Sequence, residues 1–74
     1  MPALRERLLD RLARLRPGTT MCPGKLSRDC GTTLRAARAD ILALAQDGKI
    51  MLSQRGKDVP AGAEIEGPFR VRSK

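Results

Sequence analysis

The most reactive side chains in this sequence are those of two cysteines, Cys22 and Cys30. The chain contains no histidine. Histidine is the commonest general base and the usual partner of a nucleophilic serine or cysteine. A structural zinc ion needs four ligands, and the two cysteines supply only half of that set. We therefore expect a protein that is not an enzyme and that uses no metal or other cofactor.

Cys22 stands directly before Pro23, at a position typical of a helix start. Backbone N–H groups at such an end stabilise a thiolate and lower the pKa of the thiol. Cys22 is then either a reactive, redox-sensing thiol or a small, half-buried side chain where the helix begins, and we favour the second interpretation.

Two carboxylates, Glu64 and Glu66, flank Ile65 in a stretch rich in Pro, Gly and Ala. Such a composition is typical of a loop, so we expect both carboxylates to be solvated and not paired for acid–base work. No glycine-rich phosphate loop follows a strand. The sequence therefore indicates no small-molecule substrate.

Basic side chains outnumber acidic ones by 15 to 8, and the resulting net charge of +7 favours a polyanionic partner. Most of the excess lies in residues 1–18 and 49–74. Positive side chains bind duplex DNA by contacting its phosphates and releasing counterions, and a helix N-terminus also attracts phosphate. The candidate DNA-binding residues are Lys25, Arg28, Thr32, Thr33, Arg35, Arg38, Arg55 and Lys57.

The first element that we expect is a helix over residues 3–16, ended by Pro17-Gly18. Its leucines recur at spacings of three and four residues, which is the period of an amphipathic helix. A basic amphipathic helix can also lie on a membrane surface, but this one lacks the Trp or Phe that anchors such helices, so we favour packing in a core. The leucines are Leu4, Leu8, Leu9, Leu12 and Leu15.

A second, shorter helix is predicted after an extended connection at residues 19–22. Pro23 suits the first turn of a helix, where a missing N–H costs nothing. The helix runs over residues 23–29 and buries Leu26 and Cys30. Lys25 and Arg28 then lie on this helix.

The third helix is predicted over residues 33–47, with Thr32 or Thr33 as its N-cap and Gly48 just past its end. Its exposed face is neutral and rich in alanine, whereas a helix that reads bases in the major groove presents Arg, Asn, Gln or Lys. The buried face is Leu34, Ala37, Ile41, Leu44 and Ala45, and the exposed face is Ala36, Ala39, Asp40, Ala43, Gln46 and Asp47.

Arg38 flanks the apolar stripe of this third helix and has two interpretations. It either contacts DNA or forms a structural ion pair, for example with an acidic residue of the first helix. The residue pattern leaves both open.

A β-hairpin is expected to close the domain. Residues 49–54 form one strand, residues 55–57 form a turn, and Val59 begins a return path. Residues 60–67 have the composition of a loop, and residues 69–72 alternate apolar and basic side chains, as a strand with one buried face does.

Helix, helix, helix and hairpin in this order make an α+β winged helix, a helix-turn-helix core with a C-terminal wing. We expect residues 1–74 to form one such domain, since the chain is near the lower size limit for independent folding. Phe69, the only aromatic residue, is expected in the core. Single-stranded nucleic acid is disfavoured, because such sites use exposed aromatic platforms.

The sequence also resembles a small bacterial family catalogued as domain of unknown function 3253. Members resemble one another in a Cys-Pro pair opening the second helix and a Gly-x-Ile sequence leading into the wing. They also share a closing Gly-Pro-x-Arg-x-Arg strand. The resemblance implies a winged helix and no particular activity. The residues that carry it are Met21-Cys22-Pro23, Ala37-Arg38, Leu44, Gly48-Lys49-Ile50 and Gly67-Pro68-Phe69-Arg70-Val71-Arg72.

These patterns predict a weak or non-specific binder of double-stranded DNA with a regulatory or nucleoid role. The alternative is a protein–protein interaction module that docks a partner, or its own copy, on the alanine-rich face of the third helix. Two cysteines are too few for a secreted disulfide framework, and neither a signal peptide nor a membrane span is evident. We therefore expect a cytoplasmic protein with reduced thiols and no membrane partner.

Overall fold

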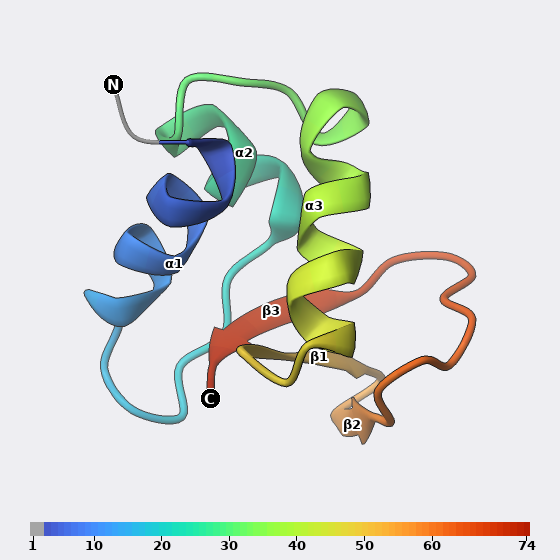
Figure 1. The fold of residues 1–74 in the computed structure, drawn as a ribbon. Helices are drawn as coiled ribbons and strands as arrows, with labels where there is room; N and C mark the ends of the chain where they lie inside the picture. The colour runs from blue at the N-terminus through green and yellow to red at the C-terminus, as the bar shows by residue number, and fades with distance from the viewer. Residues whose placement is uncertain (1–2) are drawn as a thin grey trace.

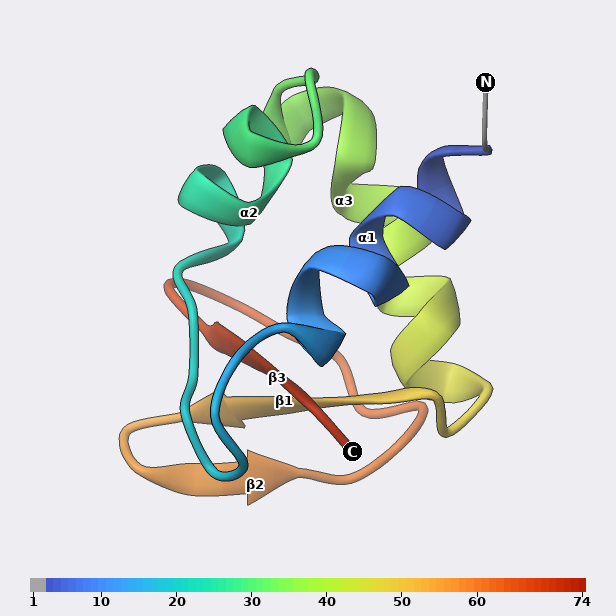
Figure 2. The same ribbon diagram turned by 90° about the vertical axis from the view of Figure 1, so that its left-hand side faces the viewer.

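A computed structural model describes residues 3–74 as three helices followed by a three-stranded antiparallel sheet. The helices lie together on one face of the sheet (Figures 1 and 2). This α+β arrangement confirms the predicted fold class and is compatible with a winged helix. None of the helices in the described range is long and apolar enough to cross a membrane. The elements are α1 (Leu4–Ala13), α2 (Pro23–Asp29), α3 (Leu34–Gln46), β1 (Ile50–Gln54), β2 (Lys57–Val59) and β3 (Arg70–Ser73).

The boundaries of α2 are those predicted, but α1 ends at Ala13, earlier than the predicted end at residue 16. The N–H groups of Arg14 and Leu15 donate to carbonyls three residues back, at Arg11 and Leu12. This tighter hydrogen-bonding pattern is common at helix ends, and it turns the chain before Pro17-Gly18 is reached.

The predicted caps of α3 are confirmed. Thr33 is the N-cap, and its hydroxyl oxygen accepts a hydrogen bond from the N–H of Ala36 at 3.2 Å. Gly48 follows the C-terminus with a φ of 74°, a left-handed conformation that glycine adopts without steric cost.

The sheet has one more strand than the predicted hairpin. β1 lies in the centre, with β2 on one side and β3 on the other. The β1–β2 turn has two residues, Arg55 and Gly56, where three were predicted, and both have positive φ values, 54° and 81°. Two such residues make a type I′ turn, whose twist suits a tight hairpin. Lys57 therefore belongs to β2 and not to the turn.

The connection between α1 and α2 is extended, as predicted, and it also touches the sheet. Met21 forms an isolated bridge with Val71 of β3, with N···O distances of 2.7 and 2.9 Å between their backbone groups. This bridge fixes the start of α2 next to the start of β3.

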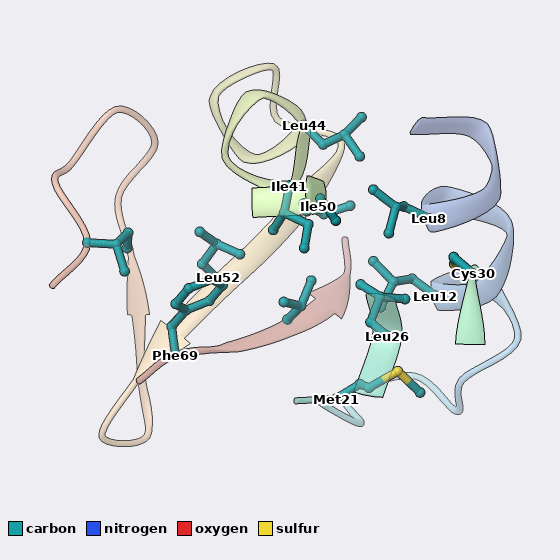
Figure 3. Close-up of a cluster of buried hydrophobic side chains, with 13 residues drawn as sticks. Leu8, Leu12, Met21, Leu26, Cys30, Ile41, Leu44, Ile50, Leu52 and Phe69 are labelled. Carbon is teal, nitrogen blue, oxygen red and sulfur yellow. The ribbon is translucent and has the colours of Figure 1, made fainter. Parts of the chain in front are cut away.

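The core lies between the helices and the inner face of the sheet, where side chains from α1, α3 and the strands meet (Figure 3). Ile41 is completely buried, and Phe69 is only 5% exposed, so both lie where the sequence predicted. Cys30 is also buried, and its Sγ atom lies 3.5 Å from the carbonyl oxygen of Arg7. The buried apolar residues are Leu8, Leu12, Met21, Leu26, Cys30, Ala37, Ile41, Leu44, Ile50, Leu52, Ile65, Phe69 and Val71.

Candidate nucleic-acid interface

Two arginines that form no ion pair within residues 3–74, Arg55 and Arg70, line one surface hollow. This hairpin hollow has a volume of about 430 Å³ and lies between the start of α2, the β1–β2 turn and the start of β3. In Figure 2 the turn and the first residues of α2 lie on the left-hand side of the molecule. Its lining residues are Cys22, Ser53, Gln54, Arg55, Pro68, Phe69 and Arg70.

Short contacts hold the walls of the hollow in place. The amide nitrogen of Gln54 donates to the carbonyl oxygens of Glu66 at 2.7 Å and Pro68 at 3.1 Å. The guanidinium of Arg70 donates to the hydroxyl oxygen of Thr20 at 2.7 Å and to its carbonyl oxygen at 3.3 Å. These hydrogen bonds therefore join three separate parts of the sequence around the hollow.

The electrostatics of the hollow are positive. Arg55 and Arg70 line it, and Arg28 of α2 lies near enough to act on the Cys22 thiol. Within residues 3–74 none of these three arginines forms an ion pair, whereas Arg5, Arg11, Arg14, Lys25 and Arg72 each do.

Cys22 is exposed, so the prediction of a half-buried side chain is wrong. The backbone N–H groups of Lys25 and Gly24 hold the pKa of its thiol below the ordinary value, and the charges of Arg70 and Arg28 act in the same direction. The cause is the one that the sequence indicated, since unpaired N–H groups at a helix start stabilise a thiolate.

Lys25 lies on a different side of α2, facing α1. Its Nζ atom is 3.5 Å from Oδ2 of Asp29, and the same oxygen accepts a hydrogen bond from Arg11 at 3.1 Å. Desolvation raises the pKa of Asp29, but the hydrogen bond from Arg11 and the charge of Lys25 outweigh it, so the pKa lies below its ordinary value. The charge of Lys25 is therefore partly neutralised by Asp29, the carboxylate that also joins α2 to α1.

The predicted residues at the start of α3 do not line the hollow. Arg35 and Thr33 are exposed, Thr32 is half-buried, and the Thr33 hydroxyl caps the helix. Ala36, Ala39, Gln46 and the C-cap Asp47 are exposed, as predicted.

Asp40 and Ala43 differ from the prediction of full exposure, because both are half-buried. Asp40 accepts a hydrogen bond from Arg5 of α1 at 2.8 Å. The ion pair between the first and third helices is therefore made by Asp40. Of the two interpretations left open for Arg38, the ion pair with an acid of α1 is not formed within residues 3–74.

Arg38 instead ties α3 to the segment before β3. Its guanidinium donates to the carbonyl oxygen of Ile65 at 3.2 Å and lies 5.8 Å from the centre of the Phe69 ring. A guanidinium over an aromatic face is an attractive contact, so Arg38 stabilises one wall of the hollow through Phe69.

Comparison with known protein families gives a match over residues 2–74 to the family described as Protein of unknown function (DUF3253). The chain belongs to this family. The resemblance drawn from the sequence is therefore confirmed. None of the curated proteins with which the chain was compared matches it.

Four residues that carried the resemblance to DUF3253 line the hairpin hollow: Cys22, Pro68, Phe69 and Arg70. Arg70 was missed as a candidate residue, although the alternation over residues 69–72 was visible. With Phe69 and Val71 in the core, Arg70 must point from the opposite face of β3. Only the Met21–Val71 bridge, which pairs segments far apart in the sequence, puts that face beside Cys22.

Proposed function

We propose that this DUF3253 protein binds double-stranded DNA weakly, through the sugar–phosphate backbone, in a regulatory or nucleoid role. The observation that carries the proposal is the convergence of Arg28, Arg55 and Arg70 at the hairpin hollow without an ion pair within residues 3–74. Guanidinium groups form strong, geometrically specific hydrogen bonds with phosphate oxygens.

Backbone contact is favoured over base readout by the composition of α3. Its exposed face presents Ala36 and Ala39, and neither side chain can hydrogen-bond a base edge. In its first turn only Arg35 is an exposed side chain of the type that reads bases. Phosphate contacts position a protein on a duplex but carry no sequence information. The expected binding is therefore strongly salt-dependent and nearly indifferent to sequence.

Double-stranded DNA is favoured over single strands by the burial of Phe69, which is 5% exposed. Proteins that hold single strands stack the bases on exposed aromatic rings, and this chain has no other aromatic residue. We also assign no reaction to the hollow, because its nucleophile, Cys22, has no histidine or carboxylate among the lining residues to act as its base.

The test is the affinity of the full chain for a random-sequence duplex over a salt series, measured by fluorescence anisotropy. The double variant Arg28→Ala/Arg55→Ala removes two proposed phosphate contacts. The matched control, Arg14→Ala/Arg16→Ala, removes the same charge from exposed positions that do not line the hollow.

For the parent, the logarithm of the affinity should fall linearly with the logarithm of the salt concentration, by about 0.9 for each phosphate engaged. In the variant Arg28→Ala/Arg55→Ala this slope should be smaller by about two phosphate contacts, that is by about 1.8. In the control variant the slope should change little, and affinity should fall mainly at low salt. Absence of binding at low salt, or equal losses in the two variants, would contradict the proposal.

The second candidate function is a protein–protein interaction module on the alanine-rich face of α3. Ala36 and Ala39 are exposed and Ala43 is half-buried, and small side chains permit close approach of a partner. Ala39→Gln would obstruct this face without changing the net charge. If it abolished self-association or capture of a partner while duplex affinity stayed at the parental level, this second function would be favoured.

A further inference from the structure

A second surface feature, of opposite charge, lies on the other side of Arg38 from the hairpin hollow. It is a groove of about 430 Å³ between α3 and the segment joining β2 to β3; this segment projects beside α3 in Figure 1. The groove and the hollow share no lining residue. The groove is lined by Arg38, Leu42, Ala45, Gln46, Leu52, Val59, Pro60, Gly62, Ala63, Glu64, Ile65 and Glu66.

The floor and walls of the groove are aliphatic. Leu52 and Ile65 are buried beneath it, while Leu42, Ala45 and Val59 are only half-buried. A smaller hollow of about 240 Å³ also borders on Ala45, Leu52 and Val59, so the apolar surface continues towards the end of α3. A concave site of this size with aliphatic walls suits one or two inserted apolar side chains.

The rim of the groove is negative, although the chain as a whole carries +7. Glu64 and Glu66 are exposed, and neither forms an ion pair within residues 3–74. The one cation of the lining, Arg38, is held against the Ile65 carbonyl and the Phe69 ring. Phosphate is repelled from such a rim, whereas a cationic side chain is attracted to it.

Main-chain pairing with a bound segment is restricted at this site. β2 is an edge strand of three residues, and Pro60, which follows it, has no N–H to donate. Recognition must therefore depend on apolar side chains in the groove and on charge at its rim.

We propose that this groove binds a short segment of a partner protein that inserts aliphatic side chains flanked by lysine or arginine. The aliphatic walls supply the burial, and Glu64 and Glu66 select the charge of the partner. This inference does not depend on the DNA proposal, because it concerns a separate surface of opposite charge.

The test uses the full ¹⁵N-labelled chain and two short synthetic peptides with one aliphatic core. One peptide has the core Lys-Leu-Val-Leu-Lys, and in the other glutamate replaces both lysines. Amide resonances of Ala45, Val59 and Ala63 should shift with the lysine peptide, which should bind about tenfold more tightly than the glutamate peptide.

The double variant Glu64→Lys/Glu66→Lys should reverse this preference and bind the glutamate peptide more tightly. The control Glu6→Lys/Asp47→Lys makes the same change of charge at exposed positions outside the groove and should keep the parental preference. All four substituted carboxylates are exposed, and an unchanged amide spectrum away from the sites would verify the fold.

Three results would overturn the proposal. The first is no shift at the groove residues up to the solubility limit of the lysine peptide. The second is equal affinity for the two peptides, because the rim would then select nothing. The third is a shift of the same amides with protein concentration alone, because the occupant would then be a second copy of the chain.

Discussion

Arg55, in the β1–β2 turn, has an unfavourable backbone conformation. It is the one non-glycine residue in the described range with a positive φ, 54°. Left-handed backbone costs an ordinary residue about 1 kcal/mol or more, and type I′ turns prefer Asn, Asp or Gly at this position. Strain of this kind is often retained at a functional site, which agrees with a role for Arg55 in binding an anion.

Replacing Arg55 with asparagine should therefore separate stability from binding. Arg55→Asn should raise the free energy of unfolding in urea by up to about 1 kcal/mol, since asparagine tolerates this conformation, and should weaken duplex binding. Lys57→Asn is the control, because it removes the same charge next to the turn at a position where φ is negative. An Arg55→Asn variant no more stable than the parent would contradict the strain argument.

The two cysteines should differ sharply in reactivity. Backbone N–H groups lower the pKa of Cys22, whereas burial raises the pKa of Cys30. The thiolate is the reactive form, so iodoacetamide at neutral pH should alkylate Cys22 first, and the rate should reach its plateau at a lower pH for Cys22 than for an unstructured thiol. Mass spectrometry of timed samples measures both sites in one molecule. Equal rates at the two cysteines in the folded protein would contradict the assignment.

At the scale of the elements, α3 packs against α1, α2 and β1. Ile41 is fully buried, so Ile41→Ala should leave a cavity and lower the free energy of unfolding by about 2–5 kcal/mol, a large part of the stability of so small a domain. Leu42→Ala removes side-chain carbons from a half-buried position and should cost clearly less. Urea unfolding compares the two, and similar losses would mean that the helix lacks the observed orientation.

Local signals made some elements predictable. The bounds of α2 follow from Pro23 at its first turn and from the glycine, Gly31, that comes soon after its end. β2 was recognised only as a return path because its three residues, Lys57–Val59, are mostly exposed and pair only where β1 lies beside them. The role of Arg38 stayed open in the sequence for a similar reason, since its contacts at Ile65 and Phe69 are distant in the sequence.

Over the whole molecule, some charged side chains pair with each other between helices, and others in the described range lie unpaired at separate surface sites. Arg5 and Arg11 tie the helices together through Asp40 and Asp29, so their charges are partly compensated. Arg55 and Arg70, which form no ion pair within residues 3–74, line the hairpin hollow, and Glu64 and Glu66, which also form none there, line the groove. A single net charge of +7 conceals this division, which arises only when β3 and the segment before it fold against α2 and α3.

The division predicts how added charge should act on DNA binding. Glu64→Lys/Glu66→Lys and Glu6→Lys/Asp47→Lys each remove two negative and add two positive charges, so each changes the net charge from +7 to +11 (7 + 4). If the duplex lies at the hairpin hollow, both variants act only through the long-range field. Both should then raise duplex affinity to a similar extent at low salt, and the gain should fade as salt screens charges more than about 10 Å apart. A gain that persists at high salt in the Glu64/Glu66 variant alone would mean that phosphates contact the groove, so the two surfaces would not be separate.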